Sequence, residues 1–77
     1  MNVGFYVTLR RDSRIIRLAG PFQDHDAAVG MVDEARRVAT EIDPFVDFDG
    51  VGTAKLTTRL ALPHGVLNGR LGLEVWP

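Results

Sequence analysis

The chain has 77 residues, of which 45% are hydrophobic and 25% are charged, with no cysteine and a formal net charge of −1. This length fits one domain over residues 1–77, with a stability margin of only about 3–5 kcal/mol. The lack of cysteine excludes disulfide bonds, thiolate metal sites and a cysteine nucleophile, and it fits a reducing cytoplasm. We expect no signal peptide and no membrane span, because no apolar run exceeds three residues.

The N-terminal segment predicts a β-hairpin. Hydrophobic side chains alternate from Val3 to Leu9, which is typical of a half-buried strand, and place Tyr6 on the opposite face. A polar turn at residues 11–13 leads into a second strand, Arg14 to Ala19, which Gly20 and Pro21 should end.

One helix is predicted over roughly residues 24–43. Asp24 is a suitable N-cap, and the Asp43-Pro44 step should stop the helix because a residue before proline is disfavoured in the α region. Apolar residues repeat at spacings of three and four and form one stripe for burial: Ala28, Met31, Val32, Ala35, Val38, Ala39 and Ile42.

Alternation resumes over residues 45–58 and predicts a third strand, with Asp47 and Asp49 on one face. Gly50 and Gly52 within this pattern predict a bulge or bend. The remaining tail, through Val75 and Trp76, is too apolar for a disordered end, so we expect a helical turn at residues 66–70 closing over the core.

These elements predict a small two-layer α+β sandwich of β-β-α-β type with a docked C-terminal tail. The sheet should be three-stranded and mainly antiparallel, in the order 2-1-3, with the helix on one face. Its other face is expected to be open, and an exposed sheet edge would also allow a homodimer. The open face would present Tyr6, Thr8, Arg10, Arg17, Asp47 and Asp49.

Charge is distributed unevenly along the chain. Residues 1–22 carry four arginines and one aspartate, a net of +3, whereas residues 23–49 carry eight acids and two arginines, a net of −6. These charges could simply solvate the helix and the turns. Alternatively, they form an acidic face that docks on a positively charged, nucleic-acid-binding surface of another protein. The residues expected to bind such a partner are Asp26, Asp33, Glu34 and Glu41, and secondarily Tyr6, Asp47 and Asp49.

The sequence gives little support for catalysis. Ser13 lies in a predicted turn with neither His25 nor His64 near it in sequence, which argues against a serine triad. No pair of histidines has helical metal-binding spacing, and the Gly50–Lys55 segment lacks the lysine position of a phosphate loop. We therefore expect no enzyme activity, no catalytic residues, no metal and no cofactor.

Direct nucleic-acid binding is the alternative function. Four arginines gather on the hairpin, and Tyr6 could stack on a base. The net charge of −1 argues against this alternative, because attraction to phosphates supplies most non-specific affinity. The candidate residues are Arg10, Arg11, Arg14 and Arg17.

Several segments between Val3 and Leu73 resemble small proteins encoded by phages, prophages and plasmids of high-GC proteobacteria. The similar segments are Phe5–Leu9, Arg17–Phe22, Asp24-His25, Ala35–Arg37, Asp43-Pro44, Phe48–Leu56 and Pro63–Asn68. Small anti-CRISPR proteins that act on type I-C systems are similar to this pattern. The resemblance implies an inhibitor that acts in the bacterial cytoplasm, binds the CRISPR effector complex and blocks its target DNA. It carries over no functional residue.

Overall fold

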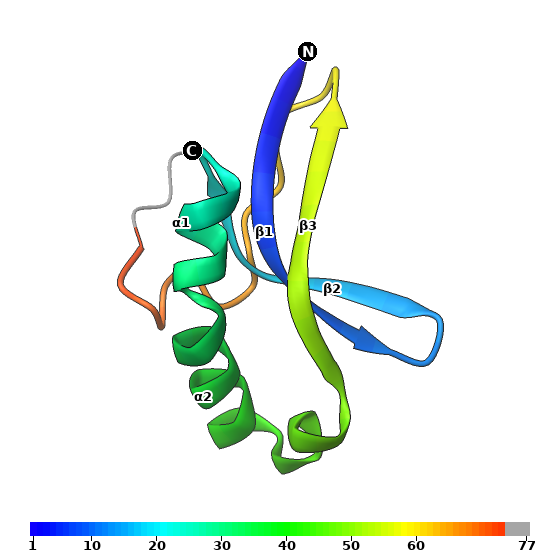
Figure 1. The fold of residues 1–77 in the computed structure, drawn as a ribbon, viewed down its shortest axis with the longest axis vertical. Helices are drawn as coiled ribbons and strands as arrows, with labels where there is room; N and C mark the ends of the chain where they lie inside the picture. Colours follow the sequence, from blue (N-terminus) through cyan, green and yellow to red (C-terminus); the bar gives the residue numbers. More distant parts are fainter. Residues whose placement is uncertain (74–77) are drawn as a thin grey trace.

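The computed structural model describes residues 1–73 as a three-stranded sheet with a layer of helices on one face (Figure 1). The predictions for Val75 and Trp76 lie outside the described residues. The strands follow the order β2-β1-β3 and both pairings are antiparallel, so the predicted α+β arrangement is confirmed. The elements are β1 (Asn2–Arg11), β2 (Arg14–Phe22), α1 (His25–Gly30), α2 (Val32–Ile42), η1 (Pro44–Phe48) and β3 (Gly50–Thr58).

The alternation predicted for β1 and β2 is confirmed, except that Val3 is exposed, and β2 continues through Gly20 and Pro21 to Phe22 and does not end at Ala19. Val7 and Leu9 of β1 and Leu18 of β2 are buried in the core on the helix side of the sheet. Asp12 adopts a φ of 56° in the hairpin turn, a conformation that aspartate tolerates better than most residues. Irregular register occurs in this hairpin, on either side of Val7.

β3 pairs with β1 over its whole length, from Asn2 opposite Thr58 to Arg10 opposite Gly50, without a register shift. Of the bulge or bend predicted at Gly50 and Gly52, the bulge is therefore wrong, whereas Figure 1 shows the first part of β3 curved. Both glycines continue the ladder, and a side chain at either position would meet no atom within 4 Å. β3 lies at the edge of the sheet, and the homodimer that such an edge would allow stays a prediction.

The single helix predicted over residues 24–43 is divided in two at Met31. Asp24 caps α1 as expected, because its carboxylate accepts a hydrogen bond of 2.8 Å from the backbone of Ala27. Met31 then donates to Ala28, three residues earlier, and this bond replaces the regular spacing of four. Gly30, which costs about 1 kcal/mol relative to alanine inside a helix, directly precedes the break.

Residues 44–48 form the short 3-10 helix η1 and not the start of the third strand. Pro44 occupies the first turn, where its missing N–H is not needed, and Asp43 accepts a hydrogen bond of 3.0 Å from the backbone of Phe45. Val46 is buried. The alternation of Val46 and Phe48 with aspartates resembled a strand, but the cap at Asp43 and Pro44 determines the local structure.

The chain after β3, residues 59–73, forms a C-terminal strap. Its first part passes behind β1 in the view of Figure 1 and covers the sheet face opposite the helices, where Pro63 contacts Tyr6, and its last residues return to the helix side. Gly65, Val66 and Leu67 donate backbone hydrogen bonds to residues of β2, and Leu67 enters the core. Turns follow at residues 66–72, so the expected docking of the tail is confirmed.

A buried asparagine fastens the strap to β2. The Asn68 side chain accepts a hydrogen bond of 3.0 Å from the Gly20 N–H and donates one of 2.6 Å to the Gly20 carbonyl. Gly20 has a φ of 124°, which an L side chain rarely adopts. These two bonds satisfy the polar groups of a buried amide that would otherwise destabilise the fold.

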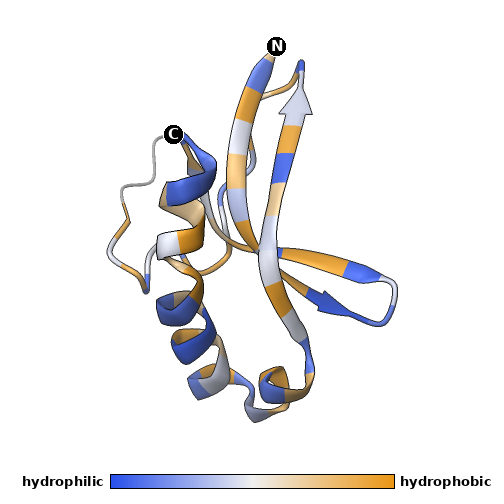
Figure 2. Cartoon of the chain, viewed as in Figure 1, coloured by the Kyte–Doolittle hydropathy of each residue, from blue (hydrophilic) through white to orange (hydrophobic). Residues whose placement is uncertain are grey.

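The core lies between the helices and the sheet. Figure 2 shows the polar side of α2 turned outward and hydrophobic residues of the strands interspersed with polar ones. Alanines on the buried side of the helices allow them to approach the sheet closely. Ile42, predicted to be part of the buried stripe, is instead half exposed at the end of α2. No helix within residues 1–73 has the length and apolarity needed to cross a membrane.

Candidate functional site

The outer face of α2 carries most of the acidic residues predicted to bind a partner. Ala35, Val38 and Ala39 fix the rotation of the helix by packing in the core, and this turns the charged residues of the opposite face toward solvent. Asp33, Glu34 and Glu41 are exposed on this face.

Arginines interrupt the acidic face. Arg37 forms ion pairs with Glu34, three residues earlier, and with Glu41, four residues later. The hydrogen bond from Arg37, followed by its charge, lowers the pKa of Glu34, and the same pairing raises the pKa of Arg37. The predicted acidic surface is therefore a mixed-charge surface with an acidic excess.

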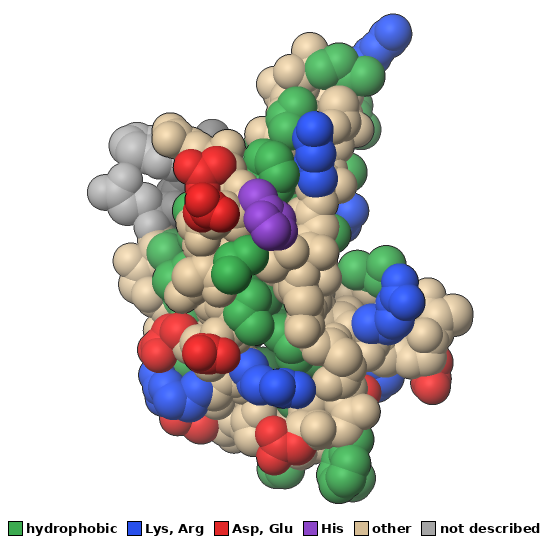
Figure 3. All heavy atoms as spheres, in the orientation of Figure 1, with side chains coloured by type: hydrophobic (Ala, Val, Ile, Leu, Met, Phe, Trp, Pro, Cys, Tyr) green, Lys and Arg blue, Asp and Glu red, His purple; other side chains and the backbone are tan. Residues whose placement is uncertain are grey.

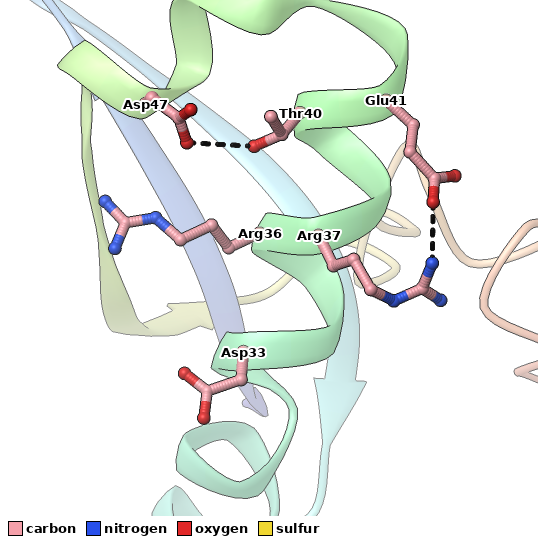
Figure 4. Close-up of a pocket in the computed structure, with 6 residues that line it drawn as sticks. All are labelled: Asp33, Arg36, Arg37, Thr40, Glu41 and Asp47. Carbon is pink, nitrogen blue, oxygen red and sulfur yellow. Dashed lines mark hydrogen bonds and ion pairs between the residues drawn. The ribbon is translucent and has the colours of Figure 1, made fainter.

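An open depression of about 400 Å³ lies between α2 and η1 (Figure 4). Asp47 of η1 faces Thr40 across it, with 3.4 Å between the Thr40 hydroxyl and the Asp47 carboxylate. Three carboxylates and two guanidinium groups line the depression, which gives a formal charge of −1. The lining residues are Asp33, Arg36, Arg37, Thr40, Glu41 and Asp47.

Asp26 belongs to the first turn of α1, where a negative charge is favourable for the helix dipole. It is exposed and is not among the residues that line the depression. Figure 3 shows acidic and basic side chains mixed along the helices on this face of the molecule. Asp26 therefore extends the acidic excess beyond α2 and does not join one compact site.

Tyr6 is not exposed, contrary to the prediction. Its side chain is fully buried beneath the C-terminal strap, and its hydroxyl donates a hydrogen bond of 2.8 Å to the Pro63 carbonyl. Burial raises the pKa of Tyr6, and the neighbouring Arg17 opposes that shift. The alternation placed Tyr6 on the correct face, but the strap that covers this face could not be located from the sequence.

Asp49 also has a different position from the one predicted. Asp47 and Asp49 do not share a strand face, because Asp47 lies in η1 and Asp49 ends it. Arg11 binds Asp49 through two hydrogen bonds of 2.9 and 2.6 Å. Arg11 also contacts Asp43 at 2.9 Å and so connects the hairpin to η1. Asp49 therefore has a structural contact and is a poor candidate for partner binding.

Replacing Arg11 with methionine is expected to raise the pKa of Asp43 toward 3.8, since the Arg11 hydrogen bond is the largest cause of its lowered pKa. A carboxyl group whose pKa is lower in the folded state stabilises the fold at pH values above its unfolded pKa. This stabilisation is lost as the pH falls through its folded pKa. The part of the stability difference between wild type and R11M that comes from Asp43 should thus be present above pH 3.8 and be lost as pH falls through the lowered pKa of Asp43. Carboxyl NMR titration and urea unfolding measure the two effects.

The control for this prediction is R14M. Arg14 lies opposite Arg11 in the hairpin register and is exposed, and none of the ion pairs within residues 1–73 involves it. R14M should leave the pKa of Asp43 unchanged. An unchanged pKa in R11M as well would show that the Arg11 contacts do not form in solution.

The hairpin arginines separate into two groups. Arg11 forms ion pairs with Asp43 and Asp49. The Arg17 guanidinium lies 5.5 Å from the centre of the Tyr6 ring. Arg10 and Arg14 are exposed on the part of the hairpin that projects from the body of the molecule in Figure 1. Two of the four arginines thus remain available for a nucleic acid.

Sequence reasoning missed an aromatic pair on η1. Phe45 and Phe48 are 70% and 87% exposed, and their ring centres lie 6.5 Å apart. Side chains three residues apart eclipse one another in a 3-10 helix, so both rings project from the same side of η1. The Asp43-Pro44 cap followed by Phe-x-x-Phe was the sequence signal that could have identified this pair.

Within residues 1–73 there is no cluster of three histidine, aspartate or glutamate side chains placed to hold a metal ion. Comparison with protein-family models, curated proteins and solved structures finds no match for this chain. The candidate surface is therefore defined by its own geometry: the charged outer face of α2 and the adjoining η1.

Proposed function

We propose that this chain is a non-enzymatic interaction protein that docks the outer face of α2 on a basic surface of another protein. The observation that supports this proposal is the row of exposed carboxylates on α2, Asp33, Glu34 and Glu41, which Asp47 of η1 continues. The backbone beneath them is regular helix, so little ordering is needed on binding. An acidic excess on a rigid surface favours association with a positively charged partner.

The partner that we propose is a CRISPR effector complex of type I-C, bound so that its target DNA is excluded. The support for this identity is the resemblance to small proteins of phages, prophages and plasmids. The charge of the α2 face is compatible with it, because a surface that binds DNA must be basic. Such an inhibitor would come from a mobile genetic element and act in the cytoplasm of the bacterial host.

Neutralising Asp33 and Glu34 together, as D33N/E34Q, is expected to weaken binding to the type I-C effector complex by about tenfold. The variant removes two carboxylates and also releases Arg37 from its ion pair with Glu34, so the face loses its acidic excess. Both side chains are exposed, so the melting temperature should change little. A gel-shift titration of the complex and its target DNA measures inhibition directly.

The matched control is S13K/T57K, which changes the net charge by the same two units at exposed positions on the hairpin turn and on β3. It should inhibit as well as wild type. If wild-type protein in large excess leaves the complex–DNA band intact, the proposed partner is wrong. If D33N/E34Q and wild type inhibit equally, the α2 face is not the binding surface.

A second candidate function is nucleic-acid binding through the hairpin, which the exposed Arg10 and Arg14 favour. A two-stranded ribbon can enter the major groove of DNA. A gel lane that holds only this protein and DNA tests this function. A shift there that falls steeply with salt and is lost in R10A/R14A would identify a nucleic-acid-binding regulator.

A further inference from the structure

The aromatic pair on η1 is an unusual feature for a small domain. Phe45 and Phe48 are more exposed than most of the other large hydrophobic side chains within residues 1–73, and Ile42, three residues before Phe45, is 51% exposed. The two rings are tilted by 43° and contact each other rather than the core. Exposed apolar groups gathered at one place, rather than scattered, are typical of interaction sites.

η1 holds the two rings on a rigid base. Val46, between them in sequence, is buried in the core. Backbone hydrogen bonds of 3.0 Å from Val46 to Asp43 and of 2.9 Å from Asp49 to Val46 close the short helix. Arg11 binds the carboxylates at both of its ends. The rings are thus presented in a fixed arrangement, which lowers the entropy cost of binding.

The size and charge of the patch indicate what could cover it. From the exposed fractions of Phe45 and Phe48, the pair offers about 300 Å² of surface, less than half of the roughly 800 Å² that each partner of a standard interface buries. Residues 41–49 carry four carboxylates; Arg11 pairs with Asp43 and Asp49, and Arg37 pairs with Glu41, so within residues 1–73 Asp47 is the one of the four without an ion pair. Two copies meeting through this patch would have too little area and would bring like charges together.

We propose that Phe45 and Phe48 are the anchors of the interface, and that they insert into an apolar pocket bordered by lysine or arginine side chains on the partner protein. This inference rests on the proposed function, because Asp47 connects the aromatic pair to the charged face of α2. Buried aromatic anchors at the centre of an interface supply most of its affinity. Basic side chains around the pocket would face Glu41 and Asp47 and could stack on the rings.

The charged face of α2 and the aromatic pair of η1 should affect different rate constants of binding. Exposed charges mainly raise the association rate, whereas anchors that fill a pocket slow dissociation. F45A/F48A should therefore increase the dissociation rate from an immobilised type I-C effector complex by at least about thirtyfold, with little change in the association rate. D33N/E34Q should mainly reduce the association rate, and this reduction should shrink at high salt.

The control I15A/L60A removes two other exposed hydrophobic side chains, one on the hairpin and one on the strap. It should dissociate like wild type. If wild type binds and F45A/F48A dissociates at the same rate, the anchor proposal is overturned while the proposed function stands. If wild type does not bind the effector complex, the anchor proposal and the proposed function are both wrong. A wild-type dimer in sedimentation that F45A/F48A dissociates would identify a second copy as the occupant and also overturn the proposal.

Discussion

Replacing Gly65 with alanine is expected to lower the free energy of unfolding by about 3 kcal/mol. A Cβ atom at this position would lie 2.6 Å from the backbone nitrogen and 2.7 Å from the carbonyl carbon of Ala19, and closer still to its Cα. These are backbone atoms of a paired strand, so they cannot move aside as a flexible side chain could. Since a chain of this length has a margin of only about 3–5 kcal/mol, G65A should be largely unfolded at modest urea concentrations.

Gly69→Ala is the matched control, because it lies four residues further along the same strap. A Cβ atom there meets nothing within 4 Å, and the residue does not have a positive φ. G69A should be neutral or slightly stabilising, since alanine reduces the entropy of the unfolded chain. If urea unfolding of G65A matches wild type, the close packing of the strap against β2 does not exist in solution.

The order of the elements could be predicted from the sequence because short-range patterns encode it. Hydrophobic residues alternate with a period of two around Val7, and they repeat with the helical period through Ala35 and Val38. The side chains of these residues are buried in the structure. Local rules also located the cap at Asp24. Where two local signals conflicted, the prediction was wrong: alternation suggested a strand at residues 45–48, while the Asp43-Pro44 cap produced a 3-10 helix.

The candidate site was harder to predict because exposure depends on contacts between distant parts of the chain. Tyr6 is covered by Pro63, 57 residues later, and Asp49 is bound by Arg11, 38 residues earlier. Contacts between residues so far apart leave no periodic pattern in the sequence. The acids of α2 were predicted correctly as exposed because a helix with one buried stripe must expose the opposite face. The ion pairs of Glu34 and Glu41 with Arg37 follow from the same helical spacing.

Replacing Tyr6 with alanine is expected to lower the free energy of unfolding by about 4 kcal/mol, more than the loss expected for G65A. Tyr6 is the largest fully buried side chain among residues 1–73, and its removal would leave a cavity between the sheet and the strap. Y6A should therefore be mostly unfolded by circular dichroism. If its urea midpoint matches that of wild type, the strap is not part of the cooperative core.

Tyr6→Phe keeps the ring and removes only the hydroxyl, so this variant should fold and lose about 1 kcal/mol from the missing hydrogen bond to Pro63. Burial raises the pKa of Tyr6 from 10.0, so above that pH the unfolded chain ionises before the folded one does. The wild-type protein should therefore lose stability as pH rises above 10, and Y6F should lose less. Tyr6 is the chain's sole tyrosine, which makes its phenolate absorbance a direct reading of that titration. An ordinary tyrosine titration in the folded protein would place Tyr6 in solvent and restore the open sheet face that its position in β1 first suggested.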